Sequence, residues 1–276
     1  MSTSDQTLAA RFFFRNCAVS LHLPGEMRIS RTLTPGHDDV VLDRDFTPAD
    51  SPSDFINSQS DFYRFLDVTS TTNASIIKKL TAIGYMLCNK LPRNGMRCRA
   101  FLCVNEESGS CANGKSLFAQ AMAQLCNTVF LPGRDCGHTF WLSSVTEKTN
   151  LVVVDDAPKK RSAQPFFHLC TQDWIIDCKC QKPLIINREK APYLLLTADT
   201  SVDKIRNDGS FRRRFGVLEF SSFFGLENRV DEYLGRIMFR DWDVAQWHMF
   251  DNLMFYCVLE YLRNYANGKD VFYFYA

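Results

Sequence analysis

Eight residues near the middle of the chain have the types and the spacing of a phosphate-binding loop. The run Gly109-Ser-Cys-Ala-Asn-Gly-Lys-Ser116 fits the pattern G-x-x-x-x-G-K-[S/T]. In such a loop the backbone N–H groups surround the phosphates of a nucleotide, the lysine contacts the outer phosphates and the hydroxyl binds Mg²⁺. The sequence therefore predicts a nucleotide and Mg²⁺ site made of Gly109, Ser110, Cys111, Ala112, Asn113, Gly114, Lys115 and Ser116.

Two carboxylates follow an apolar run about 40 residues after this loop. Leu151-Val-Val-Val154 is typical of a strand buried on both faces of a parallel sheet, and Asp155-Asp156 come directly after it. The carboxyl ends of such strands form the edge at which α/β sheets bind ligands. We predict that Asp155 holds Mg²⁺ opposite Ser116 and that Asp156 orients and polarises an attacking water. The alternative is a solvated turn after an ordinary strand.

A further apolar strand and a basic cluster lie downstream. Tyr193-Leu-Leu-Leu-Thr197 reads as a buried strand that ends in Ala198-Asp199, and Arg212-Arg-Arg214 precedes another strand, Phe215 to Phe220. Asp199 is thus placed at the same sheet edge as the two carboxylates before it. The alternative for the three arginines is a solvated loop.

A hairpin is predicted between these two groups of residues. Ile175-Ile-Asp-Cys-Lys-Cys-Gln-Lys-Pro-Leu-Ile-Ile186 reads as two short strands around a polar tip that carries Lys179 and Lys182. The alternative is an edge ribbon whose charges discourage pairing with other strands.

The phosphate-binding loop needs a strand before it and a helix after it, and the sequence provides both. Arg97 to Val104 reads as a buried strand. Apolar residues recur at helical spacing directly after the loop, at Leu117, Phe118, Ala121, Met122 and Leu125. We therefore predict an α/β fold, a P-loop NTPase with a parallel sheet flanked by helices. The alternative is a glycine-containing surface turn before a helix.

Upstream of this core the pattern is helical. Ser70-Thr-Thr-Asn73 is a cluster of N-cap residues, and Ile76, Ile77, Leu80, Ile83 and Leu87 follow at helical spacing. This predicts an amphipathic helix that ends near Pro92. Residues 1–58 carry Pro24, Pro35, Pro48 and Pro52, which break anything longer than short strands at Phe12–Phe14 and Val40–Leu42.

These patterns predict four segments. Residues 1–58 form an irregular N-terminal arm, 59–94 a small helical, collar-like segment, 95–228 the P-loop ATPase core and 229–276 a C-terminal helical segment. Within the last segment, Trp247 to Tyr265 reads as a helix.

Composition bounds the class of protein. The chain has 276 residues, of which 46% are apolar and 23 are Phe, so it can bury a globular core. A formal charge of +1 gives no global basic field, so any contact with nucleic acid must come from a local cluster or from several subunits. Eleven Cys without a C-x-x-C pair argue against structural zinc and for reduced thiols in the cytoplasm. No leader or membrane-spanning run is expected.

The ordered set of these segments resembles the superfamily 3 helicases, which are AAA+ ring motors of small DNA viruses, phages and plasmids. The resemblance rests on Gly109–Ser116, Val152–Asp156, Ile176–Lys179 with Lys190–Pro192, Leu194–Asp199 and Arg213–Phe215. The resemblance covers about residues 60 to 265. The papillomavirus replicative helicase is one member of this family. The chain is most similar to the helicase part of phage primase-helicase and primase-polymerase proteins, through Ile83–Leu87, Phe239–Asp243, Trp247 and Phe250–Asn252.

The resemblance implies an AAA+-like, ATP-dependent DNA helicase domain of a phage or mobile element that translocates on single-stranded DNA. Lys115 and Ser116 would bind ATP and Mg²⁺, with Asp155 and Asp156 as the second acidic motif. Lys179 would be the pore-hairpin lysine that contacts DNA, and Lys182 lies beside it.

The resemblance also implies a ring. Arg214, with Arg213 as the near alternative, would be the finger that reaches the ATP of a neighbouring subunit in a homo-hexamer. Asp199 departs from the family, which usually has Asn there. An Asn can donate to the γ-phosphate, whereas an ionised Asp repels it and can only accept. We also expect a primase or polymerase as a possible partner and no association with a membrane. The expected location is the cytoplasm of a bacterial host or of a virus-infected cell.

Three other classes of function remain open on the sequence. A P-loop kinase would act on a small molecule, an AAA+ remodeller would act on a polypeptide, and an inactive remnant would bind nucleotide without turnover.

Overall fold

The computed structural model describes residues 8–36, 39–91, 100–107, 113–158, 163–205 and 209–268. The chain forms two compact units, one made of Met1–Leu91 with Phe223–Ala276 and the other of Pro92–Ser222. The second, which we call the core unit, is close to the predicted ATPase core at 95–228. The first, which we call the flanking unit, joins the predicted arm, the collar-like segment and the C-terminal segment, so these are not three separate parts.

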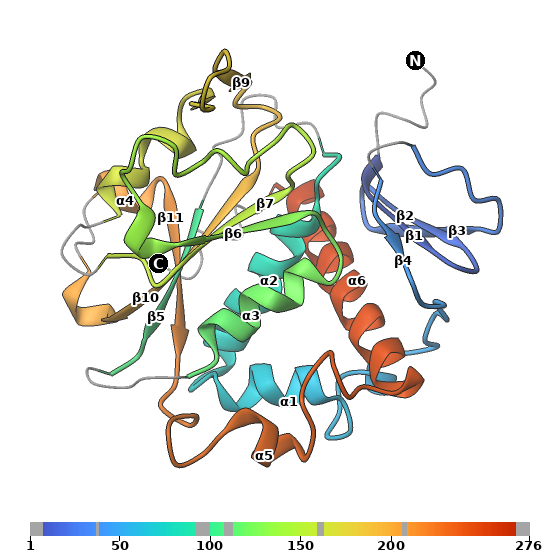
Figure 1. The fold of residues 1–276 in the computed structure, drawn as a ribbon. Coiled ribbons are helices and arrows are strands. Elements are labelled where there is room, and N and C mark those ends of the chain that lie inside the picture. Colours follow the sequence, from blue (N-terminus) through green and yellow to red (C-terminus); the bar gives the residue numbers. More distant parts are fainter. Residues whose placement is uncertain are drawn as a thin grey trace. The chain divides into compact units, whose positions relative to one another are not determined.

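The core unit is built on a five-stranded sheet in the order β11-β5-β10-β7-β6. Its strands are β5 (Ala100–Asn105), β6 (Thr128–Pro132), β7 (Leu151–Asp155), β10 (Tyr193–Ser201) and β11 (Phe215–Phe220). Every neighbouring pair is parallel. This confirms the predicted α/β P-loop NTPase sheet (Figure 1). All five carboxyl ends lie on one edge, and β10 separates the strand before the loop from the strand that ends in Asp155.

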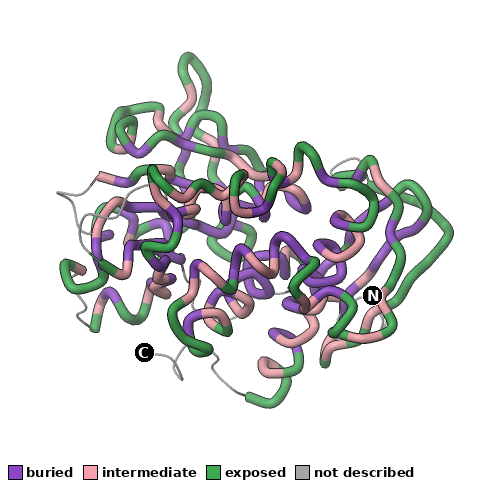
Figure 2. The backbone as a smooth tube through the Cα atoms, turned by 90° about the horizontal axis from the view of Figure 1, so that it is seen from below, coloured by how far each residue is buried: buried purple, intermediate pink, exposed green. Residues whose placement is uncertain are grey.

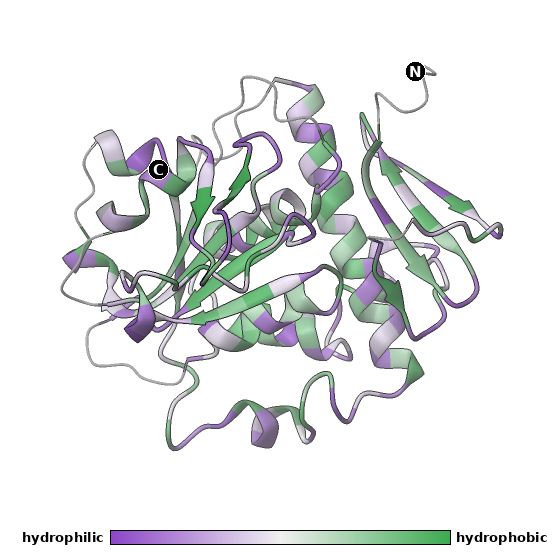
Figure 3. Cartoon of the chain, turned by 45° about the horizontal axis from the view of Figure 1, so that its top comes forward, coloured by the Kyte–Doolittle hydropathy of each residue, from purple (hydrophilic) through white to green (hydrophobic). Residues whose placement is uncertain are grey.

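Side chains on both faces of this sheet are buried, which explains why its strands read as continuous apolar runs. Helix α3 (Lys115–Ala123) packs against one face, where the rings of Phe118 and Phe220 lie 5.7 Å apart. On the opposite face, alternate strand residues such as Leu102 and Val154 join a cluster with the segment around Trp174. The strands appear as apolar bands in Figure 3, and Figure 2 marks the buried parts of the backbone.

The remaining elements of the core unit are short. β8 (Trp174–Ile176) and β9 (Leu184–Ile186) form an antiparallel two-stranded ribbon, as predicted for the hairpin. Trp174 anchors its base, since the ring is fully buried and Nε1 donates to the Leu169 carbonyl at 2.8 Å. Helix α4 spans Gly209–Arg212, and 3₁₀ turns span Gly133–Asp135, Gln164–Phe166, His168–Cys170 and Val202–Lys204.

The flanking unit begins with a four-stranded sheet where an irregular arm was predicted. β1 (Leu8–Phe14), β2 (Ala18–His22), β3 (Glu26–Ser30) and β4 (Val41–Leu42) lie in the order β3-β2-β1-β4. The arm prediction is wrong because the prolines fall between the strands and not within them. Pro24 lies in the β2–β3 turn and Pro35 between β3 and β4. Only the short strands at Phe12–Phe14 and Val40–Leu42 were anticipated.

Helices form the rest of the flanking unit. They are α1 (Asp61–Val68), α2 (Asn73–Leu87), α5 (Val230–Leu234) and α6 (Val244–Ala266), with a 3₁₀ turn at Pro52–Asp54. α2 confirms the predicted amphipathic helix, and the Thr72 side chain caps it by accepting from Ser75 N at 3.1 Å. α6 confirms the helix predicted at 247–265. α6 packs against α2, where the rings of Tyr85 and Tyr261 lie 5.7 Å apart. It also packs against the four-stranded sheet of the flanking unit, where the rings of Phe12 and Phe255 lie 4.8 Å apart. No helix in the described ranges is long and apolar enough to span a bilayer.

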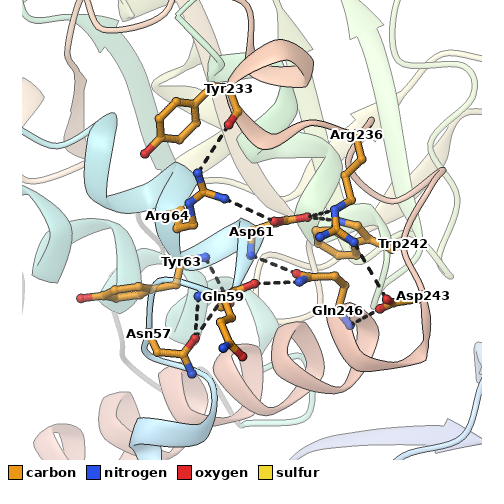
Figure 4. A network of polar contacts seen from close by, with 11 residues as sticks. Asn57, Gln59, Asp61, Tyr63, Arg64, Tyr233, Arg236, Trp242, Asp243 and Gln246 are labelled. Atoms are coloured by element: carbon orange, nitrogen blue, oxygen red, sulfur yellow. Dashed lines mark hydrogen bonds and ion pairs between the residues drawn. The ribbon is translucent and has the colours of Figure 1, made fainter.

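Two buried carboxylates tie segments of the flanking unit together. Asp251 of α6 accepts from Arg44 through both oxygens, at 2.6 and 2.8 Å, and is fully buried. Asp61, at the start of α1, forms an ion pair with Arg236 at 3.1 Å and accepts from Trp242 Nε1 at 3.0 Å (Figure 4). Burial raises the pKa of each carboxyl group, and the neighbouring arginine opposes that shift.

Candidate nucleotide site

The end of the phosphate-binding loop begins helix α3. Gly114 is the N-cap with φ of 87°, a left-handed conformation that favours glycine, and Lys115 and Ser116 are the first two helical residues. The helix N-terminus therefore carries both functional side chains of the motif and the positive end of the helix dipole. Asn113 is described as well, whereas Gly109, Ser110, Cys111 and Ala112 lie outside the described residues.

Ser116 and Asp155 meet at the carboxyl edge of the sheet, as predicted. Ser116 Oγ donates to Asp155 Oδ1 at 2.7 Å. The same carboxylate oxygen accepts from Thr197 Oγ1 of β10 at 2.6 Å, so hydroxyls from two other elements fix the carboxylate. A hydroxyl beside a carboxylate is an oxygen pair of the kind that Mg²⁺ prefers. The two residues therefore fit the ion, and Ser116 and Asp155 would hold it.

Lys115 lies in a second group of polar side chains beside the first. Its Nζ donates to Asn113 Oδ1 at 2.6 Å and also to Asn105 Oδ1. Asn113 Nδ2 donates to the same Asn105 oxygen at 2.9 Å. Asn105 Nδ2 in turn donates to Asp199 Oδ1 at 2.9 Å. The loop lysine and Asp199 of β10 are thus joined through one amide.

Asp156 directs an exposed carboxylate from the same edge. Its backbone has φ of 57°, and its N–H donates to Thr197 Oγ1 at 2.9 Å. The end of β6 holds this turn closely, because a Cβ added at Gly133 would lie 1.9 Å from the Asp156 carbonyl oxygen. A non-glycine residue in the left-handed region is uncommon and occurs often at functional sites. The exposed carboxylate is free of burial and has room to contact water.

The two candidate finger arginines differ in their surroundings. Arg214 is half-buried, with its guanidinium 5.0 Å from the centre of the Phe167 ring and Nη1 donating to the Ser210 carbonyl at 3.0 Å. Arg213 is exposed. Arg214 is thus held by contacts within its own unit. Arg213, which is exposed, is the arginine that is better placed to contact a neighbouring subunit.

The two candidate DNA-binding lysines lie apart from these groups, at the tip of the β8–β9 ribbon. Lys179 and Lys182 are both exposed, and Cys180 between them has φ of 59°, which closes the turn. Ile175 and Ile185 face each other across the ribbon and are 63% and 62% exposed. The ribbon therefore presents a basic tip above an exposed apolar pair.

Three site residues escaped the sequence analysis. Asn105 and Thr197 are almost fully buried, at 1% and 3% exposed, and Gly133 directly follows β6. A polar residue directly after an apolar run was the available signal for the first two. For Gly133 the sequence carried no signal, because its contact with Asp156 is made across two strands.

The chain matches no protein-family model and no curated protein. Among solved structures, it is similar to the apo A form of the NrS-1 C-terminal region, with 11% identity and a TM-score of 0.45 over 92% of this chain and 65% of that one. It is also similar to JCV helicase, with 14% identity and a TM-score of 0.37 over 76% of this chain and 67% of that one. A mutant of Thermotoga maritima RuvB gives 17% identity and a TM-score of 0.34 over 66% of this chain and 52% of that one. The chain thus spans 65% of the first of these structures.

Proposed function

We propose that this chain is an ATP-dependent motor domain that translocates on single-stranded DNA as a ring of identical subunits. The observation that carries the ATPase proposal is the hydrogen bond between Ser116 and Asp155 at the carboxyl edge of the parallel sheet, with Lys115 beside Ser116 at the start of α3. The DNA part rests on the basic tip of the ribbon and on the resemblance of the ordered motifs to superfamily 3 helicases.

Each residue of the site has a role in this proposal. Lys115 binds the outer phosphates and stabilises the charge that develops on the transferring phosphoryl group. Ser116 and Asp155 hold Mg²⁺, which when bound neutralises phosphate charge. Asp156, exposed at the same edge, orients the attacking water and accepts its proton.

The ring completes the site. An arginine from a neighbouring subunit, Arg213 in preference to Arg214, reaches the ATP and adds positive charge in the transition state. The exposed lysines at the ribbon tip, repeated in every subunit around one axis, give a nearly neutral chain a basic channel for a polyanion. A homo-hexamer, with a separate primase or polymerase as partner, is the assembly we propose.

The test is ATP hydrolysis with and without single-stranded DNA, measured beside the assembly state. We expect turnover that requires Mg²⁺, rises with single-stranded DNA and accompanies a ring. Turnover that rises instead with a small molecule would identify a kinase, and turnover that rises with a polypeptide would identify a remodeller. ATP binding without turnover under any of these conditions would identify an inactive remnant. Each of these three outcomes contradicts the proposal.

A further inference from the structure

Asn105 is a buried polar residue to which no motif assigns a role. It is the last residue of β5, and 1% of it is exposed. Its side chain oxygen accepts from Lys115 Nζ and, at 2.9 Å, from Asn113 Nδ2. Its side chain nitrogen donates to Asp199 Oδ1 at 2.9 Å. One amide therefore lies between the cation of the phosphate-binding loop and the anion at the end of β10.

We propose that Asn105 is a positioning residue of the ATPase site, which holds Lys115 through its oxygen and Asp199 through its nitrogen. This inference rests on the ATPase function proposed above. In this proposal the side-chain amide of Asn105 allows a carboxylate at position 199 to lie beside the terminal phosphate of ATP.

The hydrogen bonds fix the direction of the amide. Lys115 can only donate and an ionised Asp199 can only accept, so the oxygen of Asn105 must face the lysine and its nitrogen the carboxylate. Hydrogen bonds to charged groups are stronger than neutral ones, and a chain that runs from cation through amide to anion polarises each of its members. Reversal of the amide would break both contacts at once.

The strand geometry directs Asp199 to this amide. β5 and β10 are parallel neighbours in which Thr197 pairs with Cys103, but the register shifts before Ser201 pairs with Asn105. Irregularities of this kind re-aim side chains next to functional sites. Asp199 lies inside the shifted stretch, half-buried, and its carboxylate reaches across to the end of β5.

An ionised carboxylate near the γ-phosphate has a cost that this arrangement reduces. Like charges repel, and in a partly buried site the repulsion is larger than in water. The hydrogen bond from Asn105 binds one oxygen of Asp199 and connects its charge to that of Lys115.

The test compares steady-state ATP hydrolysis by Asn105→Leu, Asn105→Asp and the exchange variant Asn105→Asp/Asp199→Asn. Leucine is similar in size and makes neither hydrogen bond, so we expect kcat to fall roughly tenfold or more, since two charge-assisted bonds are lost. We expect the KM for ATP to change less than about threefold, because Lys115 keeps Asn113 as a partner. The exchange variant restores a donor opposite an acceptor, so it should recover most of the kcat lost in Asn105→Asp.

The pH profile gives a readout that a merely structural role would not change. In Asn105→Asp two carboxyl groups face each other, and their mutual repulsion raises the second pKa of the pair, while Lys115 beside position 105 opposes that shift. One shared proton rebuilds the hydrogen bond, so kcat relative to wild type should rise as pH falls through that raised pKa and decline above it. The exchange variant should lack this added dependence.

A buried amide in the flanking unit serves as the matched control. Gln246 is 6% exposed, accepts from Asp61 N at 3.0 Å and donates to the Gln59 carbonyl at 2.7 Å. Gln246→Leu should lower stability and leave kcat per folded molecule unchanged.

The inference is overturned if Asn105→Leu keeps wild-type kcat, or if the exchange variant is no more active than Asn105→Asp. If the wild type hydrolyses ATP and Lys115→Ala does not, the ATPase proposal would still hold. A wild-type chain that does not hydrolyse ATP would overturn both.

Discussion

Lys115 is the residue on which the proposed chemistry depends most directly. Its ammonium lies between two asparagine side chains at the start of α3, where an incoming phosphate can replace them as acceptor. Lys115→Ala should lower the kcat of ATP hydrolysis by about 10²-fold or more, because the contact to the developing phosphoryl charge is lost. Steady-state hydrolysis with Lys148→Ala, an exposed lysine of the same unit, is the comparison. Wild-type turnover in Lys115→Ala would place the active site elsewhere.

Asp199→Asn should keep or raise turnover. An asparagine oxygen can still accept from Asn105 Nδ2, so the contact at 2.9 Å survives while one negative charge near the γ-phosphate is removed. Asp199→Leu, which can accept nothing, should by contrast lower kcat. Both variants are measured by ATP hydrolysis at saturating nucleotide. A large loss of kcat in Asp199→Asn would mean that the charge itself is needed.

For single residues, the sequence indicated the residues of the known motifs and missed the polar residues that hold them in place. Ser116 and Asp155 were placed together because strand ends and loop motifs share one sheet edge. Asn105 and Thr197 were missed because their roles come from neighbouring strands, and strand order is a non-local property. The choice between Arg213 and Arg214 needed the position of Phe167, which is distant in sequence.

The β8–β9 ribbon is the element that we expect to contact DNA. Lys179→Ala should weaken binding to single-stranded DNA and flatten its salt dependence, since fewer counterions are released per bound strand. Basal ATP hydrolysis should be nearly unchanged, while stimulation by DNA should fall. Lys182→Ala should show the same pattern more weakly. The measurement is fluorescence anisotropy over a series of salt concentrations.

Two results would contradict the role of the ribbon. One is unchanged DNA affinity at low salt in both lysine variants while the protein still assembles. The other is loss of nucleotide binding in Lys179→Ala, which would assign that lysine to the ATP site.

The turn after β6 supports the turn after β7. Because the Gly133 position has no room for a Cβ beside the Asp156 carbonyl, Gly133→Ala must displace one of the two turns. We expect kcat to fall roughly tenfold or more through misplacement of the Asp156 carboxylate, with a smaller change in nucleotide affinity. Gly209→Ala is the control, since a Cβ there meets nothing within 4 Å. Equal kcat in both variants would show that Asp156 does not depend on this contact.

Among the elements, those with a pattern inside one segment were predictable, whereas the sheet of the flanking unit was not. α2, α6 and the five core strands carry their periodicity or apolar runs within one segment. The sheet of the flanking unit depends on β1 pairing with both β2 and β4, with β4 more than twenty residues away in sequence. Its prolines were read as breaks in structure, whereas they mark the ends of strands.

On the scale of the whole molecule, the Arg44–Asp251 pair links the segment after the sheet of the flanking unit to α6. Arg44→Met should lower the free energy of unfolding by about 3–5 kcal/mol near pH 7, because Asp251 is left buried without its partner. Loss of the arginine raises the already elevated pKa of this carboxyl further. The folded state then binds a proton more tightly than the unfolded state, so the penalty is largest above the folded pKa and shrinks as pH falls toward the unfolded value.

Urea unfolding at about pH 7 and about pH 5 tests this sign. The loss in Arg44→Met should be smaller at the lower pH, and Arg44→Met/Asp251→Asn should recover much of it at the higher pH. An equal loss at both values would mean that lost packing of Arg44 on Trp247, 4.3 Å from its guanidinium, and not the unpaired carboxyl, accounts for the effect.

The division of the chain also sets an order of events during synthesis. The flanking unit needs α6, which supplies Phe255 to the sheet and Tyr261 to α2, yet α6 is translated after every residue of the core unit. A ribosome that has just synthesised the core unit has therefore made the candidate nucleotide site but only the first of the two segments that form the flanking unit. The core unit can fold while translation continues, whereas β1, β2 and α2 must wait with their apolar faces uncovered until α6 emerges.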